Sequence, residues 1–206
     1  MSAADKPFII GLTGSIGMGK STISQMFEDA GVAVFDADEA VHQLQGRDGA
    51  LVPKIEAAFP GTTNENGVDR QKLGAAVFGD AARLKLLESI IHPAVAERRK
   101  AFLSAHLADD FIVFDIPLLF EKGGADKVDA VVVVSASAEL QRARVLARPG
   151  MTVQKLDQII ALQTPDAEKR ARADYVIDTA GELADSRAQV QKILQNLRTS
   201  LAHQKK

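Results

Sequence analysis

Five short apolar runs recur along the chain, and polar segments with helical patterning separate them. The runs cover residues 8–12, 32–35, 111–114, 130–134 and 175–177. Several are rich in Val and Ile and hold almost no polar residue, which is typical of parallel strands covered by helices on both faces. Alternation of such strands with helices predicts an α/β fold with a five-stranded, mainly parallel sheet.

The segments between the runs carry signals for helix starts and stops. The predicted helices cover residues 20–30, 137–148, 153–163 and 182–201. Gly31 suits the left-handed residue that follows a helix, Pro149 and Gly150 end the second helix, and Thr152 can cap the third. The polar ending, residues 203–206, is expected to fray.

One interval, between residues 35 and 111, is too long for a simple crossover between two strands. Its pattern is mostly helical, with a break at the Pro- and Gly-containing stretch 60–67. We interpret the interval as an insertion that forms a second lobe.

Composition excludes several classes of function. With 206 residues the chain can build one domain with a full core, and a net charge of −2 gives no overall basic surface for nucleic acid. The absence of cysteine excludes disulfides, thiolate metal sites and thiol catalysis. The first apolar run is too short for a signal peptide or a membrane-spanning helix, so a cytoplasmic protein without a membrane partner is expected.

The most informative motif is Gly14-x4-Gly19-Lys20-Ser21, directly after the first apolar run and at the start of a predicted helix. Its glycines let several backbone N–H groups point at one anion, and the helix adds its positive N-terminal end. Lys20 can reach the β- and γ-phosphates of a nucleotide, and Ser21 can ligate Mg²⁺. The alternative is an ordinary glycine-rich turn, and the side chain of Met18 needs no role beyond filling space.

Carboxylates follow two of the predicted strands. Asp36 and Asp38 come after the second run, where one can act as a general base or bind the waters of a metal ion. Asp36 with Glu39 also resembles a capping box before a helix at 39–45, and both interpretations can hold, one for each aspartate. Asp115 ends the third run, where it can hold Mg²⁺ or simply cap the strand end.

Basic residues gather late in the chain. Arg144 and Arg148 are four apart in a predicted helix and share a face, a suitable arrangement for closing over phosphates. Lys169, Arg170 and Arg172 form a second group, and in both groups a solvated helix face is the plainer interpretation. The Asp-Thr-Ala-Gly stretch 178–181 resembles a GTPase switch motif but lies too late in the chain. We interpret it as a strand-to-helix loop that can touch the nucleotide base.

Taken together, these segments resemble the dephospho-coenzyme A kinase family over about residues 8–198. The motifs that carry the resemblance are, in order along the chain, Gly-Leu-Thr-Gly-Ser-Ile-Gly-Met-Gly-Lys-Ser-Thr (11–22), Asp-Ala-Asp (36–38), Asp69-Arg70-x-x-Leu73 with Phe78, Ile-Ile-His-Pro (90–93), Pro-Leu-Leu-Phe-Glu (117–121), Arg144-x3-Arg148, Gln163 and Ala-Asp-x-Val-Ile-Asp (173–178).

The resemblance implies a P-loop NTPase fold in three parts. The parts are a nucleotide core at about 7–38, 111–141 and 173–206, a helical CoA-binding lobe at about 39–110, and a lid at about 142–172. The implied reaction moves the γ-phosphate of ATP to the ribose 3′-hydroxyl of 3′-dephospho-CoA, with Mg²⁺ as cofactor. The implied general base is Asp38, and the residues that stabilise charge on the transferring group are Lys20, Arg144 and Arg148.

The same resemblance implies two sets of binding residues and a metal pair. The ATP set is Gly14, Ser15, Gly17, Met18, Gly19, Lys20, Ser21, Thr22, Asp178 and Gly181. The substrate set is Asp38, Arg70, His92, Pro117, Leu118, Leu119 and Glu121. The metal pair is Ser21 with Asp115.

The sequence departs from the family pattern at Ser15, Met18 and Thr179, of which Thr179 replaces an Asn that can contact adenine. Arg70 can pair with phosphates of coenzyme A or with an acidic neighbour. His92 precedes Pro93, where a helix boundary and a structural hydrogen bond are the plainer interpretation.

Three functions are alternatives to dephospho-CoA phosphorylation: another small-molecule P-loop kinase, a regulatory nucleotide switch, and an inactive homologue. The Pro-Leu-Leu-Phe-Glu and Ile-Ile-His-Pro motifs argue against the first, and the missing guanine motif Asn-Lys-x-Asp argues against the second. All chemical positions named above are present, which argues against the third. We expect a monomer or a weak homo-oligomer.

Overall fold

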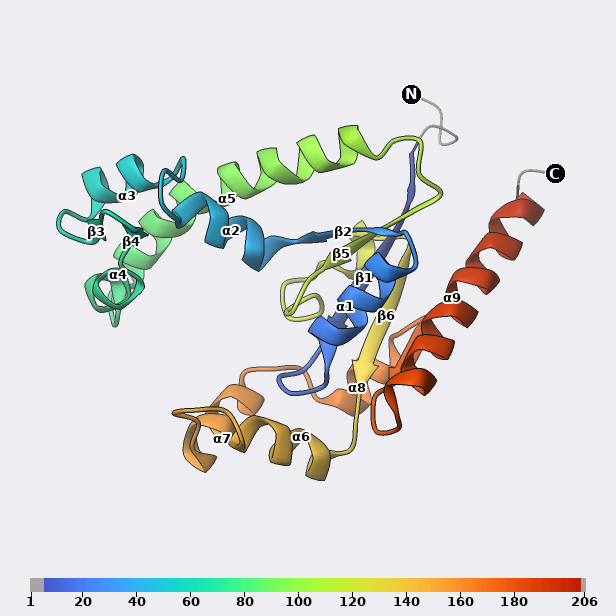
Figure 1. Ribbon diagram of the computed structural model, residues 1–206. Coiled ribbons are helices and arrows are strands. Elements are labelled where there is room, and N and C mark those ends of the chain that lie inside the picture. The colour runs from blue at the N-terminus through green and yellow to red at the C-terminus, as the bar shows by residue number, and fades with distance from the viewer. Residues whose placement is uncertain (1–5, 205–206) are drawn as a thin grey trace. The chain divides into compact units, whose positions relative to one another are not determined.

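The computed structural model describes residues 6–204, so the first five residues and the last two of the predicted polar ending lie outside it (Figure 1). The chain forms two compact units. The first comprises Met1–Val34 with His106–Lys206, and the second comprises Phe35–Ala105. Because the insertion returns to the sheet at its end, the first unit is built from two separate stretches of sequence.

A five-stranded sheet organises the first unit, as predicted. Its strands are β1 Phe8–Gly14, β2 Ala33–Asp36, β5 Phe111–Asp115, β6 Ala130–Ser135 and β7 Tyr175–Asp178. Their order is β2-β5-β1-β6-β7, and β1 runs parallel to both β5 and β6, as does β6 to β7. The prediction of an α/β fold is confirmed.

Every strand extends one or two residues beyond its predicted carboxyl end. In β1 the ladder continues through Gly14, which pairs with Val134, and Leu12 pairs with Asp115. Glycine and polar residues there keep their backbone hydrogen bonds although they break the apolar pattern. The residues that can take part in chemistry, such as Asp115, therefore lie within the hydrogen-bonded carboxyl ends of the strands.

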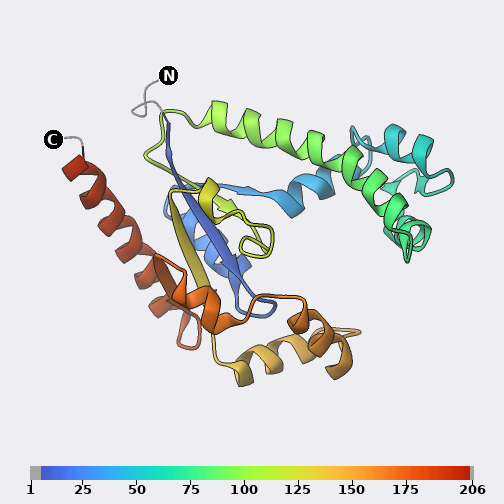
Figure 2. The ribbon, with the colours of Figure 1, turned by 180° about the vertical axis from the view of Figure 1, so that it is seen from behind.

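Helices and turns cover both faces of the sheet. Helices α1 Lys20–Asp29 and α9 Leu183–Gln204 pack on one face around Phe27 and Leu194, in a core with Ile10 and Val132 (Figures 1 and 2). On the other face, Leu119 and Phe120 pack against Val131 and Val133. Burial on both faces explains why the strand runs contain almost no polar residue.

Some predicted helix ends agree with the structure and others differ from it. Thr152 caps α7 Val153–Ala161 by accepting from the N–H of Lys155, and Gly31 takes a φ of 80° after α1, as expected. Helix α6 Ala138–Leu146 ends two residues earlier than predicted. Helix α9 continues to Gln204, so the predicted end at 201 was wrong: a polar side chain does not itself stop a helix.

The second unit is mainly helical. Its elements are α2 Ala37–Gln45, α3 Val52–Ala58, β3 Thr63–Asn64, β4 Gly67–Val68, α4 Arg70–Val77 and α5 Ala81–Ala105. Ile55, Phe59 and Leu73 form its core together with Leu87 of α5. Pro93 lies inside α5, so the expected boundary at His92 was wrong. The side chains around it, Ile91 and Ala94 among them, pack on the core and offset the lost backbone bond.

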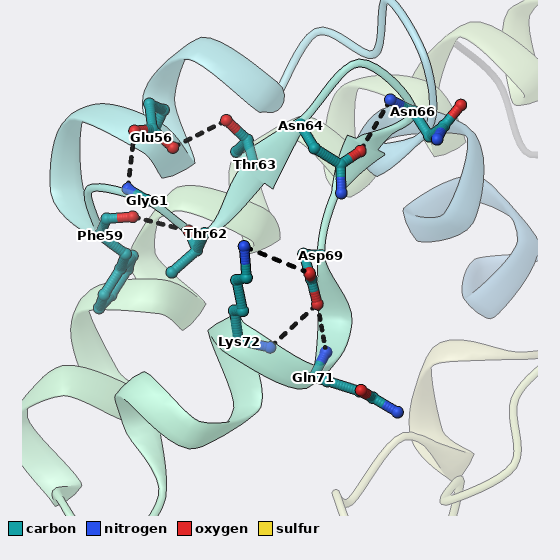
Figure 3. Close-up of polar contacts among 10 residues, drawn as sticks. All are labelled: Glu56, Phe59, Gly61, Thr62, Thr63, Asn64, Asn66, Asp69, Gln71 and Lys72. Carbon is teal, nitrogen blue, oxygen red and sulfur yellow. Dashed lines mark hydrogen bonds and ion pairs between the residues drawn. The ribbon is translucent and has the colours of Figure 1, made fainter.

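The predicted break at 60–67 contains the β3–β4 hairpin (Figure 3). The carboxylate of Glu56 accepts from the N–H of Gly61 and from the hydroxyl of Thr63, each at 2.7 Å. Asp69 caps α4 by accepting from the N–H groups of Gln71 and Lys72. The hydrogen bonds from Gly61 and Thr63 hold the pKa of Glu56 below its usual value.

In the described part of the chain, no helix combines the length and the apolar character needed to cross a membrane.

Candidate functional site

The loop between β1 and α1 has a backbone that only glycine adopts easily. Gly17 and Gly19 have φ values of 77° and 91°, and Gly19 precedes α1 without a side-chain cap. A Cβ atom at Gly17 would lie 2.4 Å from Cγ2 of Val145 on α6. The first N–H groups of α1 are thus left to an anion, as the motif predicts.

Side chains from distant segments hold this loop. Gln163 accepts from the N–H of Ile16 at 3.1 Å, and Gln141 donates to the carbonyl of the same residue at 2.8 Å. Met18 is buried, and its sulfur accepts from the N–H of Ala136 at 3.2 Å. The Met18 side chain therefore does more than fill space, and Gln141 is a contact that sequence reasoning missed.

Lys20 and Asp115 form an ion pair at the start of α1 and the end of β5. Asp115 is buried, and its carboxylate faces the ammonium of Lys20. Asp115 is therefore more than a strand-end cap. Ser21 lies exposed at the N-terminus of α1.

Two hard oxygen donors, the hydroxyl of Ser21 and the carboxylate of Asp115, suit Mg²⁺, which in proteins takes few protein ligands and completes its shell with phosphates and water. Among the described residues, no group of three or more His, Cys, Asp or Glu side chains could hold a metal ion. The donor set fits Mg²⁺ that arrives with a nucleotide.

A cavity of about 240 Å³ opens beside the loop. Its lining comprises Gly17, Gly19, Thr22, Ile23, Arg144, Arg148, Thr179, Gly181, Leu183 and Ser186. Arg144 and Arg148 thus line one cavity, although Arg148 lies beyond the end of α6. Arg142 pairs instead with Asp157 of α7.

The two residues of the loop after β7 that are predicted to bind ATP lie in different environments. Gly181 lines the cavity, but the carboxylate of Asp178 accepts from the N–H of Ala180 at 2.8 Å and does not line it. Thr179 is buried and binds Arg144, Met18 and Ser135. No local pattern marked Thr179 for this role.

The turn after β5 contains two of the residues expected to bind substrate, and both have protein contacts. Leu119 is fully buried in the core, where its side chain supports the turn. Glu121 pairs with the wholly buried Lys169 of α8 Asp166–Ala171, at 2.9 Å, and accepts from the N–H of Thr164. Lys169 therefore does not belong to a solvated face.

Burial acts to raise the pKa of Glu121, but the hydrogen bonds from Lys169 and from the backbone outweigh it and lower the pKa below the usual value. Glu121 is therefore ionised at neutral pH. The carbonyl of Pro117 accepts from the hydroxyl of Thr13 at 3.2 Å. The carbonyls of Leu118 and Leu119 accept from the N–H groups of Lys122 and Gly124 at 3.1 and 2.8 Å.

In the second unit, the two aspartates of Asp-Ala-Asp have separate environments. Asp36 caps α2, accepting from the N–H groups of Asp38 and Glu39 at 2.8 and 3.0 Å. The predicted helix at 39–45 therefore starts earlier, at Ala37. The carboxylate of Asp38 has no hydrogen-bond partner among the described residues, so capping does not use it.

Arg70 and His92 also belong to this unit. Arg70 donates to Nδ1 of His42 at 2.6 Å, a partner that is neither acidic nor predicted. His92 is exposed and has no hydrogen-bond partner within the part of the chain that the structure describes, so the expected structural bond is absent there.

The site combines a glycine-rich phosphate loop after β1, a lysine paired to the aspartate of the neighbouring strand, and two arginines that line the adjacent cavity. This combination defines a P-loop kinase. The chain matches the family described as dephospho-CoA kinase over residues 8–185. A dephospho-CoA kinase of Novosphingobium aromaticivorans is 63% identical over 193 residues, which are 94% of this chain and 96% of that protein. The chain belongs to the dephospho-CoA kinase family.

Solved structures agree on the fold. The protein TT1252 of Thermus thermophilus superposes with a TM-score of 0.79 at 34% identity, covering 93% of this chain and 98% of that one. A dephospho-CoA kinase of Campylobacter jejuni gives a TM-score of 0.63 at 24% identity, covering 92% and 96%. At that identity the second likeness concerns the fold alone.

Proposed function

We propose that the chain transfers the γ-phosphate of ATP to the ribose 3′-hydroxyl of 3′-dephospho-CoA, giving CoA and ADP. The observation that carries the proposal is the cavity in which the phosphate loop, Arg144 and Arg148 meet. It joins backbone donors, a helix N-terminus and two guanidiniums, the groups that phosphoryl transfer needs. Family membership supplies the acceptor.

The phosphate end of the reaction falls to residues of the first unit. Backbone N–H groups of residues 14–22 would hold the β- and γ-phosphates, and Lys20 would leave Asp115 to contact them. Three cations, Lys20, Arg144 and Arg148, would stabilise the charge that develops on the transferring group. Mg²⁺, held by Ser21 and Asp115, would neutralise phosphate charge.

We assign the general base to Asp38 and recognition of the CoA portion to the second unit. The Asp38 carboxylate is available to take the proton of the 3′-hydroxyl because Asp36 alone caps α2. Arg70, held at one nitrogen by His42, keeps further N–H donors that can bind phosphates of the substrate. His92, exposed on α5, is a second candidate for such a contact.

The test is ADP release with ATP, Mg²⁺ and 3′-dephospho-CoA, with AMP, adenosine and shikimate as alternative acceptors. Dephospho-CoA should accelerate release, and Asp38→Asn should lower kcat by about 10²–10⁴-fold. Asp36→Asn is the matched control, because it keeps an acceptor for the cap and should alter stability more than kcat. Release driven only by another acceptor would refute the substrate, and unchanged kcat in Asp38→Asn would refute the base.

A further inference from the structure

Thr179, between β7 and α9, makes more long-range contacts than any predicted role explains. Its hydroxyl accepts from Nη1 of Arg144 at 2.9 Å, and its carbonyl accepts from Nη2 of the same guanidinium at 2.7 Å. The same hydroxyl donates to the carbonyl of Met18, in the phosphate loop, at 2.8 Å. One small residue thus touches both the loop and the arginine beside it.

The hydroxyl has one proton to donate. The carbonyl of Ser135 lies 3.3 Å away and that of Met18 lies closer, so the Met18 carbonyl takes the proton and the lone pairs face Arg144. A guanidinium has five N–H donors. Two of them go to Thr179, which leaves three for oxygen atoms in the cavity that Arg144 lines.

The packing leaves Thr179 little freedom. The residue is 7% exposed, and a Cβ atom at Gly19 would lie 3.3 Å from its hydroxyl. A Cβ-branched side chain is stiff at its first torsion, so the hydroxyl keeps one direction. Because this hydroxyl is bonded to protein groups, it is not directed at a nucleotide base.

We propose that Thr179 is a positioning residue for phosphoryl transfer, which fixes the Arg144 guanidinium relative to the phosphate loop through its hydroxyl and carbonyl. The inference rests on the proposed function, in which Arg144 stabilises the transferring phosphoryl group. A guanidinium held in place before the reaction stabilises developing charge better than one that must be ordered during it. Thr179 acts through Arg144 and touches no reacting atom.

The decisive variants are Thr179→Val, which keeps the shape and removes the hydroxyl, and Thr179→Ser, which keeps the hydroxyl. Thr179→Val should lower kcat about 10-fold, with KM for ATP changed less than about threefold. Thr179→Ser should recover most of kcat. Thr199→Val removes an exposed hydroxyl that bonds within α9 and should match the parent protein.

A double-mutant cycle with Arg144→Lys separates positioning from general stability. Lysine cannot make the two-point contact, so Thr179→Val should cost little more in the Arg144→Lys background. Equal losses in both backgrounds, or a changed preference for ATP over GTP with kcat intact, would overturn the proposal. Unfolding midpoints for all variants show whether a loss of kcat merely follows a loss of structure.

A readout without activity keeps this inference separate from the proposed function. In the ligand-free protein, the side-chain N–H signal of Arg144 should broaden or shift in Thr179→Val and stay in place in Thr179→Ser and Thr199→Val. An unchanged signal would overturn the positioning role even if dephospho-CoA is phosphorylated. A changed signal supports the contact even if another acceptor turns out to be the substrate.

Discussion

The phosphate loop and the β3–β4 hairpin both depend on polar contacts to backbone groups. The partners of the loop are far away in sequence, whereas those of the hairpin are close. Ile16 and Met18 bond to Gln163 and Thr179, which are 147 and 161 residues away in sequence. At the hairpin, Glu56 of the preceding helix α3 bonds to Gly61 and Thr63, which are only five and seven residues away. The loop is shaped by the folded unit around it, whereas the hairpin is shaped by its own neighbours.

This difference predicts how far the structural effect of a substitution extends in each region. A change at a residue that contacts the loop from afar should alter both the loop and the distant segment, because the contact joins them. A change in the hairpin should stay local.

The largest loss of stability is expected where a long-range contact in the first unit is also charged, at Glu121 and Lys169. Glu121→Gln leaves the wholly buried Lys169 ammonium without a counter-charge, which should cost about 3–5 kcal/mol of unfolding free energy. Combining Glu121→Gln with Lys169→Met removes both charges and should recover most of the loss. Denaturant unfolding with an unchanged slope measures both values.

The matched control is Asp157→Asn, which breaks the exposed pair with Arg142, whose side chains are 58% and 46% accessible. Exposed pairs contribute about 0–1 kcal/mol, so this variant should unfold almost like the parent protein. If Glu121→Gln were no less stable than Asp157→Asn, the buried pair would not hold the turn after β5 to α8.

Two glycines with nearly the same φ, one in the phosphate loop and one just before the hairpin, allow a steric test of the comparison between these regions. Gly17 has a φ of 77° and Gly61 a φ of 79°, but only Gly17 has an atom within 4 Å of a Cβ position. Gly61→Ala should cost about 1–2 kcal/mol for the left-handed backbone alone. Gly17→Ala should cost about 1–3 kcal/mol more and weaken ATP binding, because its methyl group meets Val145.

Trimming Val145 to Ala in the Gly17→Ala protein should restore part of the ATP affinity, since it removes the clashing methyl groups. Unfolding curves and ATP titrations give the two readouts. Equal losses for Gly17→Ala and Gly61→Ala would mean that α6 yields to the loop, and the view of a loop held from afar would have to be abandoned.

The same contrast marks what could be predicted from sequence. Strands, the phosphate loop and local caps such as Thr152 and Asp36 follow from short patterns, so they were available before the structure. The burial of Lys169 and the contacts of Thr179 depend on which segments meet after folding. A basic residue near two arginines has the pattern of a solvated face whether or not a carboxylate covers it.

Pro93 and Leu119 show the same dependence on packing after folding. Pro93 is a helix breaker by local rules, yet α5 continues through it because residues on both sides pack on the core. Leu119 belongs to a motif that the resemblance implies for substrate binding, but the structure buries it completely. Motif membership indicates that a segment matters, whereas only packing shows which of its side chains reach a ligand.

The smallest effect is expected at Glu56, the α3 residue that bonds to the start of the hairpin, and it should depend on pH. Hydrogen bonds to Gly61 and Thr63 hold the pKa of Glu56 below its usual value of 4.5, so they stabilise the folded state when the carboxylate is ionised. This contribution is complete above the unfolded pKa and is lost as the pH falls through the lower, folded pKa. Glu56→Gln should therefore unfold more easily than the parent protein at pH 7, and the gap should close in acid. Glu65→Gln removes the same charge from an exposed position in the same hairpin and should show no such gap; if it did, net charge and not the Glu56 contacts would set the pH dependence.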